Sequence, residues 1–410
     1  MTDEDLTPDE AMLGAAVRGW LADFVDNSYL NEQESSPDGY EVERWKRIRD
    51  LGWHAVTVPD RLGGGGGTLA EASVVAREAG RAAYASPLLA TMRAATVLGA
   101  LNADGRFDAS LTRIADGEPA ALVAPPDRTV TASPVDGGHL LSGPPTIVEW
   151  LDTATDVALL LPMAGHPAEI GSDRRAAVGD VGMAGVGSVV SGRGGVGAES
   201  ADGAGRPPVV GDWVVAVLAR DELVARLSPA PSIDNERIAR LDLDGLVVRD
   251  ASPVSAEDAR RVLAGANLLR ASLMVGGCAD VLDRTARYAL ERFQFGRPIG
   301  GFQAVRHHLA RMVIAADAAR LTTNDALGRW VPGAEEPAIA EVALFAAARS
   351  YVECVLTAAQ LHGGVGTTTE HVLHHHFRRA KAMRLRTGKR AMRLRDLHEA
   401  LVVRGEASLW

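Results

Sequence analysis

Two glycine-containing connections carry residue types that could hold a phosphate group. The first runs from Arg292 through Gly296 to Gln303, and the second runs from Gln360 to Gly366. Glycine lets backbone N–H groups approach a phosphate closely, and a neighbouring arginine adds charge-assisted hydrogen bonds. Glycine also ends helices, so each connection taken alone is explained equally well as a helix C-cap. Neither connection contains a GxGxxG motif or a P-loop, so neither is a usual Rossmann or Walker site.

A basic segment towards the C-terminal end is a second candidate for binding an anion. Residues 374–395 contain nine lysines and arginines and no acidic residue, although the chain of 410 residues carries a net charge of −10. The acidic balance argues against general nucleic-acid binding. The segment therefore indicates a specific anionic ligand or an acidic partner surface, with a solvated helix face as the alternative.

Neither a metal site nor a disulfide is indicated. His371 and His375 would share a helix face, but no cysteine lies at ligand spacing beside them, so we expect no metal. The two cysteines, Cys278 and Cys354, lie in apolar, helix-like sequence, which predicts buried free thiols. No signal peptide is visible and no uncharged apolar run reaches the length of a membrane span, so we expect a cytoplasmic protein.

The elements that must position these residues fall into three regions. Residues 1–119 read as helices, because apolar residues recur at i, i+3 and i+4. Residues 120–252 contain short β-like runs separated by turn signals. Residues 253–410 return to helical patterns, in four long stretches at 256–293, 302–330, 337–362 and 370–403. We therefore predict a mainly α protein with a central β domain and a C-terminal four-helix bundle.

A glycine-rich segment interrupts the β region. The chain has 43 glycines, and residues 164–206 combine glycine, serine and alanine with almost no bulky apolar residues. A loop of this length is usually either disordered or functional. Its composition favours a disordered insertion, because it offers too little apolar surface to bury.

The two glycine-containing connections are much more specific together than apart. Residues 288–305, 360–366 and 377–381 resemble the C-terminal domain of the acyl-CoA dehydrogenases, and residues 233–245 are similar to the closing β segment of that family. The order of the three regions fits as well. The resemblance implies an N-terminal helical domain, a middle β-barrel and a C-terminal four-helix bundle.

The same resemblance implies an activity. Members of the family bind FAD in a dimer and introduce an α,β double bond into an acyl-CoA thioester. A carboxylate removes the α-proton, flavin N5 accepts the β-hydride, and an electron-transfer flavoprotein or a similar acceptor takes up the electrons.

The family's two motifs reach across the dimer to the partner's FAD, where they hold its pyrophosphate and adenosine end. By that resemblance the FAD contacts of this chain are Arg292, Gln294, Phe295, Gln303, Gln360, Gly363 and Gly364, with Gly388 near the adenine end.

Three departures from the family pattern leave this chain without a catalytic residue of its own. The family's usual base, a Glu directly before a Gly, is Thr387 here, and threonine is not a base near neutral pH without strong activation. An alternative base position falls near Ala266 or Asn267, where no carboxylate lies. The Glu-Pro-x-x-Gly-Ser-Asp segment that grips flavin and acyl chain is replaced by Val-Ala-Pro-Pro-Asp-Arg at 123–128.

These selective losses lead to three hypotheses. The first is a non-catalytic subunit that contributes FAD contacts to a homologous catalytic subunit in an α2β2 assembly, of the kind known in bacterial steroid side-chain catabolism. The second is a self-sufficient homodimer with a relocated base, such as Asp258 or Glu370. The third is a non-enzymatic protein of this fold that binds a partner or acyl-CoA. Small residues at 263–277 would allow a wide cavity for a ring-bearing acyl group.

Overall fold

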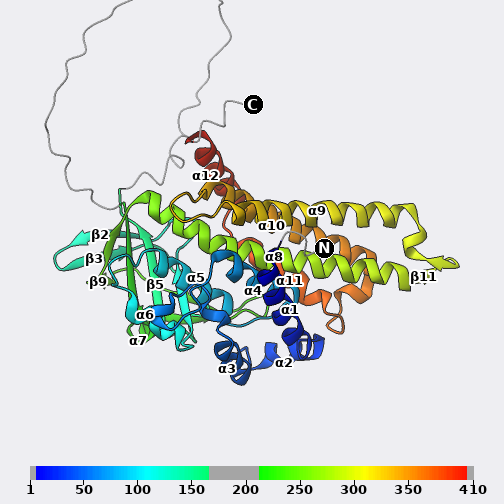
Figure 1. The fold of residues 1–410 in the computed structure, drawn as a ribbon, viewed down its shortest axis with the longest axis horizontal. Coiled ribbons are helices and arrows are strands. Elements are labelled where there is room, and N and C mark those ends of the chain that lie inside the picture. Colours follow the sequence, from blue (N-terminus) through cyan, green and yellow to red (C-terminus); the bar gives the residue numbers. More distant parts are fainter. Residues whose placement is uncertain (1–5, 166–211, 404–410) are drawn as a thin grey trace, which may run out of the picture.

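The structure is a computed structural model that describes residues 6–165 and 212–403 (Figure 1). The segment at 164–206, expected as a disordered insertion, lies outside the described residues except for its first two. The described residues run from helices through a β region to helices again, which confirms a mainly α fold with a central β domain. Figure 1 places the β region at one end of a long helical body.

Helices α1 to α6 form the N-terminal part. Thr7 and Thr68 begin two of them with capping boxes, in which the threonine side chain accepts from the backbone of Glu10 or Glu71 and the glutamate returns the bond. The second of these helices buries only Leu30. The helices are α1 (Pro8–Ala22), α2 (Asn27–Ser35), α3 (Val42–Asp50), α4 (Leu69–Arg81), α5 (Leu88–Ala100) and α6 (Asp108–Ala115).

The β region is built on a four-stranded sheet in the order β1-β5-β6-β10, with two three-stranded sheets, β2-β3-β9 and β4-β8-β7. Alternate residues of β5 face opposite sides: Leu160 packs towards the helices, and Leu159 and Leu161 pack towards the other strands. The strands are β1 (Ala120–Val123), β2 (Thr131–Val135), β3 (Gly138–Ser142), β4 (Thr146–Glu149), β5 (Asp156–Pro162), β6 (Trp213–Ala219), β7 (Leu227–Ala230), β8 (Ile238–Leu241), β9 (Val247–Val248) and β10 (Ser252–Val254), with the short helix α7 (Arg220–Leu223) between β6 and β7.

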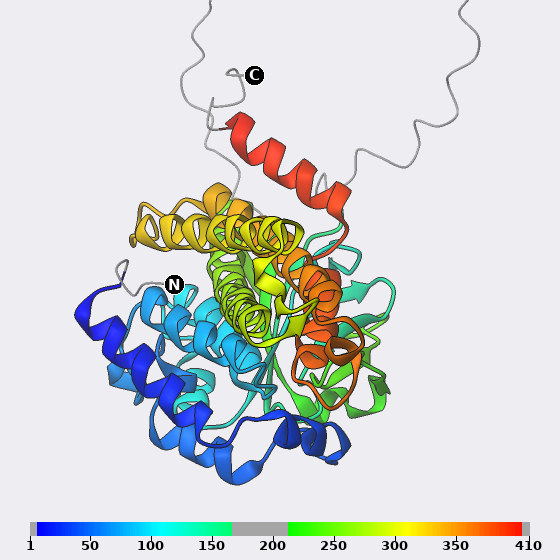
Figure 2. The same cartoon turned by 90° about the vertical axis from the view of Figure 1, so that its right-hand side faces the viewer.

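The C-terminal part is made of α8 (Ala256–Glu291), α9 (Gln303–Gly328), α10 (Pro337–His362), α11 (Leu373–Arg386) and α12 (Arg390–Val403). The prediction of one helix over 370–403 was wrong, because Gly388 has a φ of +90° and the Thr387 hydroxyl donates to the Arg384 carbonyl, which ends α11. Figure 2 shows α12 set apart from the other helices. A hairpin of β11 (Phe293–Gln294) and β12 (Arg297–Pro298) joins α8 to α9, and the turn η6 (Gly363–Thr367) follows α10.

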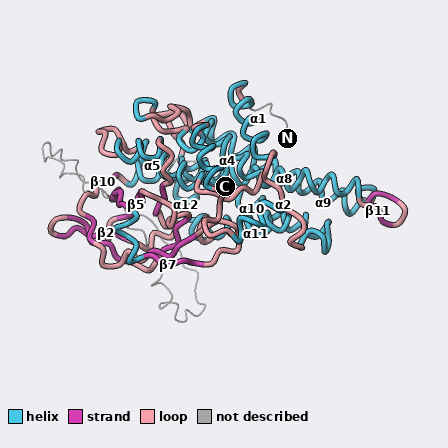
Figure 3. Tube along the Cα trace, turned by 90° about the horizontal axis from the view of Figure 1, so that it is seen from below, coloured by secondary structure: helices cyan, strands magenta, loops and turns pink. Residues whose placement is uncertain are grey.

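Helix α8 runs through the whole body and contacts α4, α5, α9, α10 and α11 (Figure 3). Two helices, α8 and α10 with η6, are long and apolar enough to cross a membrane by length and composition, but 94% of the apolar window of α8 is buried inside the protein. Its apolar surface is therefore covered by packing. The α4–α8 contact brings backbones together, since a Cβ at Gly80 would lie 1.8 Å from the Leu273 carbonyl oxygen and one at Gly276 would lie 1.8 Å from that of Arg77.

Gly80→Ala should therefore lower the free energy of unfolding by about 2 kcal/mol or more, because the added methyl forces two packed helix backbones apart. The matched control is Gly19→Ala on the exposed side of α1, where no atom lies within 4 Å of the new Cβ. That control should raise stability by up to about 1 kcal/mol through helix propensity. Urea unfolding followed by circular dichroism measures both, and an unchanged Gly80→Ala protein would contradict this account of the packing.

Candidate functional site

The structure brings the two glycine-containing motifs together at one end of the helical body. Tyr288, one turn before Arg292 on α8, stacks its ring on His362 at the end of α10, with ring centroids 4.1 Å apart. Gly363 follows His362 directly, so this stacked pair joins the hairpin of the first motif to the η6 turn of the second. Figure 2 looks onto this end of the body, at which both the hairpin and the turn lie.

The predicted FAD contacts at this end project outward. The side chains of Arg292, Gln294, Gln303 and Gln360 are exposed, and Phe295 at the hairpin tip is 92% exposed. Among the described residues, no side-chain hydrogen bond or ion pair holds the Arg292 guanidinium.

The η6 turn exposes backbone beside these side chains. A Cβ at Gly363 or Gly364 would meet no atom within 4 Å, and Gly363 has a φ of +62°. Open glycine backbone beside a free guanidinium and three side-chain amides is a donor set suited to a diphosphate and an adenosine. The residues present therefore fit the outer half of an FAD.

Gly388 lies elsewhere. It is separated from η6 by the whole length of α11, 14 residues or about 20 Å. A Cβ on Gly388 would lie 3.1 Å from Pro126 of the β region, which lines the large cavity described below. The structure thus groups seven of the eight predicted contacts and sets Gly388 apart from them.

The positions where the family carries its base hold no free acid in this chain. Thr387 is buried, and its hydroxyl donates to the Arg384 carbonyl oxygen at 2.7 Å. Ala266 is buried in the apolar core, and the Asn267 amide donates to the Glu341 carboxylate at 3.3 Å.

The two carboxylates considered as relocated bases are placed differently. Asp258 is engaged at the start of α8, where Ser255 and Arg261 both bind its carboxylate and hold its pKa below the ordinary range. Glu370 lies exposed in the turn before α11. Neither lines the large cavity.

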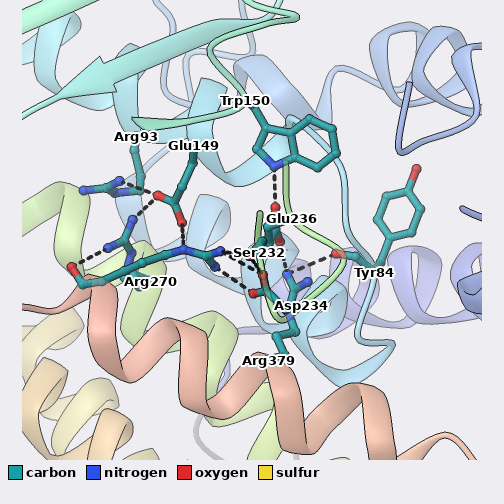
Figure 4. A network of polar contacts seen from close by, with 10 residues as sticks. Tyr84, Arg93, Glu149, Trp150, Ser232, Asp234, Glu236, Arg270 and Arg379 are labelled. Atoms are coloured by element: carbon teal, nitrogen blue, oxygen red, sulfur yellow. Dashed lines mark hydrogen bonds and ion pairs between the residues drawn. The ribbon is translucent and has the colours of Figure 1, made fainter. Parts of the chain in front are cut away.

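A buried ion network that the sequence analysis did not predict lies beside these positions (Figure 4). Glu149, at the end of β4, binds three guanidinium groups that come from three different helices. Arg93 of α5 and Arg386 of α11 each lie 3.4 Å from its carboxylate oxygens, and Arg270 of α8 makes a closer pair. Burial alone would raise the pKa of Glu149, but Arg270, Arg386 and Arg93 lower it to about 2. Glu149 is therefore ionised at neutral pH.

The network continues along α11. Arg386 forms a two-pronged ion pair with Asp234, at 2.8 Å for each nitrogen, and Arg379 pairs with Glu236 at 2.6 Å. Glu236 also accepts a hydrogen bond from the Trp150 indole (Figure 4). These members lie far apart along the chain, and their only signal in the sequence was the basic segment to which Arg379 and Arg386 belong.

A cavity of about 1410 Å³ opens between the β region, the N-terminal ends of α8 and α10, and helices α11 and α12. One wall is apolar and includes Leu122, Trp213, Ile238 and Leu263. The ion network forms another wall, and residues 123–128, which replace the family's flavin-gripping segment, form a third. The chain therefore keeps a large cavity although no free carboxylate stands at the expected base positions.

One group of potential metal ligands lies in the described residues, formed by Glu34, His374 and His375. Glu34 already makes a two-pronged ion pair with Arg378. The Asn235 amide nitrogen and a guanidinium nitrogen of Arg378 lie 3.3 Å and 3.2 Å from His375 Nδ1, so that ring nitrogen already has partners. This geometry disfavours a cation, and the absence of a metal site remains a prediction.

The chain matches two models of one protein family. Residues 7–117 match the acyl-CoA dehydrogenase N-terminal domain, and residues 258–402 match the acyl-CoA dehydrogenase C-terminal domain. The chain therefore belongs to the acyl-CoA dehydrogenase family, as its motifs suggested.

Individual relatives cover nearly the whole chain. Acyl-CoA dehydrogenase IpdE2 of Mycobacterium tuberculosis is 27% identical over 380 residues, which are 92% of each chain. A variant of the Tcur3481–Tcur3483 steroid ACAD has the same fold, with a TM-score of 0.77 at 22% identity over 97% of this chain and 99% of that one. The ChsE4–ChsE5 complex from Mycobacterium tuberculosis gives a TM-score of 0.75 at 22% identity over 97% and 98%. FAD is the cofactor of the family, and PigA, a neighbour in fold with a TM-score of 0.72 at 17% identity over 97% and 99%, is described with FAD and proline.

Glu149→Gln should lower the free energy of unfolding by about 3–5 kcal/mol at pH 7, because it leaves three buried guanidinium groups without their shared counter-charge. The pKa of Glu149 is lowered from 4.5 to about 2 in the folded protein. Its stabilising contribution is therefore complete above about pH 4.5 and is lost as the pH falls towards 2. The variant and the unchanged protein should differ less in urea unfolding at pH 4 than at pH 7. Glu257→Gln, which changes an exposed carboxylate, is the control. An unchanged free energy of unfolding for Glu149→Gln at pH 7 would contradict the prediction.

Proposed function

We propose that this chain is a non-catalytic subunit of a heteromeric, FAD-dependent acyl-CoA dehydrogenase. It pairs in the cytoplasm, as α2β2, with a homologous subunit that supplies the base, and together they introduce an α,β double bond into an acyl-CoA. The electrons pass to an electron-transfer flavoprotein or a similar acceptor. This chain lends its Arg292 and Gln360 motifs to the FAD held by the partner.

The observation that carries the proposal is the outward display of the two motifs. Arg292, Gln360 and Gly363 share an exposed end of the body, and no side chain among the described residues neutralises Arg292. This end lies away from the chain's own cavity, so these residues serve a ligand that is bound elsewhere. A partner subunit placed against this end would supply that ligand.

Exposed apolar side chains around the same end support a partner. Phe293 is 60% exposed and Leu290 is 70% exposed, beside Phe295 and Val365. Contiguous apolar surface of this kind marks an interaction site. The third hypothesis, a protein that needs no flavin, leaves this display of Arg292 unexplained.

A second support is that the chain lacks a base while keeping the motifs that reach outward. Thr387 and Asn267 stand where the family carries carboxylates, and both are hydrogen-bonded into the protein. When FAD is bound, it supplies the acceptor for the β-hydride, and the partner's carboxylate takes the α-proton. The residues of this chain would hold the diphosphate by Arg292 and by the open backbone of Gly363 and Gly364.

The relatives support a heteromeric enzyme with a bulky substrate. Two neighbours in fold are pairs of chains, Tcur3481–Tcur3483 and ChsE4–ChsE5, and the first is named a steroid ACAD. We extend this to a ring-bearing acyl-CoA as the substrate of the complex.

Arg292→Ala should reduce the FAD content of the co-expressed complex. Loss of a charge-assisted hydrogen bond to the diphosphate costs about 1.5–3 kcal/mol, or about ten- to a hundredfold in FAD affinity. The complex would be made by co-expressing the chain with acyl-CoA dehydrogenase subunits of the same genome that carry the base. The flavin spectrum and the dehydrogenation rate with an electron acceptor give the readout. Arg47→Ala, an exposed arginine on α3, should leave both unchanged.

Two other results would overturn the proposal. A chain expressed alone that carries stoichiometric FAD and dehydrogenates acyl-CoA would establish the homodimeric alternative, and loss of that activity in Asp258→Asn or Glu370→Gln would then identify its base. A complex whose flavin content does not respond to Arg292→Ala would favour a binding protein that does not contact flavin.

A further inference from the structure

The wall of the cavity formed by the ion network contains more positive than negative charge. Four guanidinium groups line it, those of Arg93, Arg270, Arg386 and Arg393. Three carboxylates form ion pairs with them. Glu149 pairs with Arg93, Arg270 and Arg386, Asp234 pairs with Arg386 as well, and Glu341 pairs with Arg393 at 2.9 Å. The group therefore carries one positive charge in excess.

These arginines are withdrawn from water. The side chains of Arg93 and Arg270 are 9% and 6% exposed, and the Nε of Arg270 is buried without a hydrogen-bond partner. One guanidinium nitrogen of Arg93 points away from Glu149 in Figure 4. Burial, and then Arg270 beside it, lower the pKa of Arg93 to about 9. One positive charge in excess in such surroundings is costly, and an anion delivered from the cavity would neutralise it.

One wall of the cavity suits an apolar body, and the charged residues outside the ion network, Asp127, Arg128, Glu257, Arg260, Glu335 and Glu336, line other parts of it. Leu122, Trp213, Ile238 and Leu263 line it, together with prolines of the β region. The one positive charge in excess within the ion network, beside this apolar wall, matches a ligand with one negative charge and a large apolar part. A dinucleotide or a free coenzyme, with several phosphates, would leave most of its charge unmatched there.

We propose that this cavity binds an apolar carboxylate, with the carboxylate held by Arg93 and Arg270 and the apolar part against Leu263 and Trp213. The site belongs to this chain alone, requires no flavin and is distinct from the exposed end that meets a partner's FAD. The proposed carboxylate site does not rest on the proposed function, because its residues lie in the cavity whether or not the chain forms a heteromer.

Isothermal titration of the full-length chain tests the proposal at pH 7.5. Decanoate is the linear probe, cholate is the ring-bearing probe, and methyl decanoate is the uncharged control. We expect at least one of the two carboxylates to bind. If decanoate binds, methyl decanoate should bind at least about tenfold more weakly, because the ester cannot form the charge-assisted hydrogen bonds. Failure of both carboxylates to bind, or equal binding of decanoate and its ester, would overturn the proposal.

Three variants separate the two halves of the site. Arg93→Met should weaken carboxylate binding at least about tenfold, Arg93→Lys should retain more of it, and Leu263→Trp should abolish it by filling the apolar part while leaving the arginines in place. If Arg93→Met does not fold, the lysine and tryptophan variants still decide. Carboxylate binding that is unchanged in Leu263→Trp, or unchanged in Arg93→Met, would place the ligand elsewhere and overturn the assignment.

Discussion

The ionised state of Glu149 is the constraint on which the junction of the three parts depends. Its carboxylate lies at the end of a strand of the β region, while its arginine partners come from α5, α8 and α11. A carboxylate removed from water is stable only if its counter-charges are in place, and a guanidinium group is stable under the same condition. Each helix must therefore reach its final position for the others to be stable, which gives the junction a single arrangement.

Helix α8 transmits that constraint along the molecule. Arg270 lies in its middle, next to the close backbone contacts at Leu273 and Gly276 with α4. Farther along, Tyr288 stacks on His362, so the same helix fixes the relation between the two motifs at the exposed end. The cavity and the outward-facing motifs are thus two ends of one rigid element. A change in α8 packing would be felt at both.

The predictable features were those with a local signature. Helix periodicity and short apolar β runs gave the order of the parts, and the paired glycine motifs gave a family that the domain models bear out. The sequence analysis missed the break between α11 and α12. That break depends on a turn in which Gly388 has a positive φ and the Thr387 hydroxyl donates to the Arg384 carbonyl.

The ion network around Glu149 could not be predicted from the sequence, because its contacts join residues far apart along the chain. Glu149 has no neighbour in sequence that announces its role, and its arginine partners lie 56, 121 and 237 residues away. In sequence, the substitution of Thr387 reads as the loss of a base and nothing more. In the structure, the adjacent Arg386 pairs with Glu149 and Asp234.

That neighbouring pair supports the fold at the position where a base was expected and Thr387 stands. A carboxylate at position 387 would add a further negative charge beside Arg393, whose Nε binds the Thr387 carbonyl and whose other nitrogen binds Glu341. It would compete for arginines that the junction uses for its own stability. The region around Thr387 is organised by fixed ion pairs, which hold Arg386 and Arg393 in place. In this chain the contacts of Arg386 and Arg393 include ion pairs that stabilise the junction.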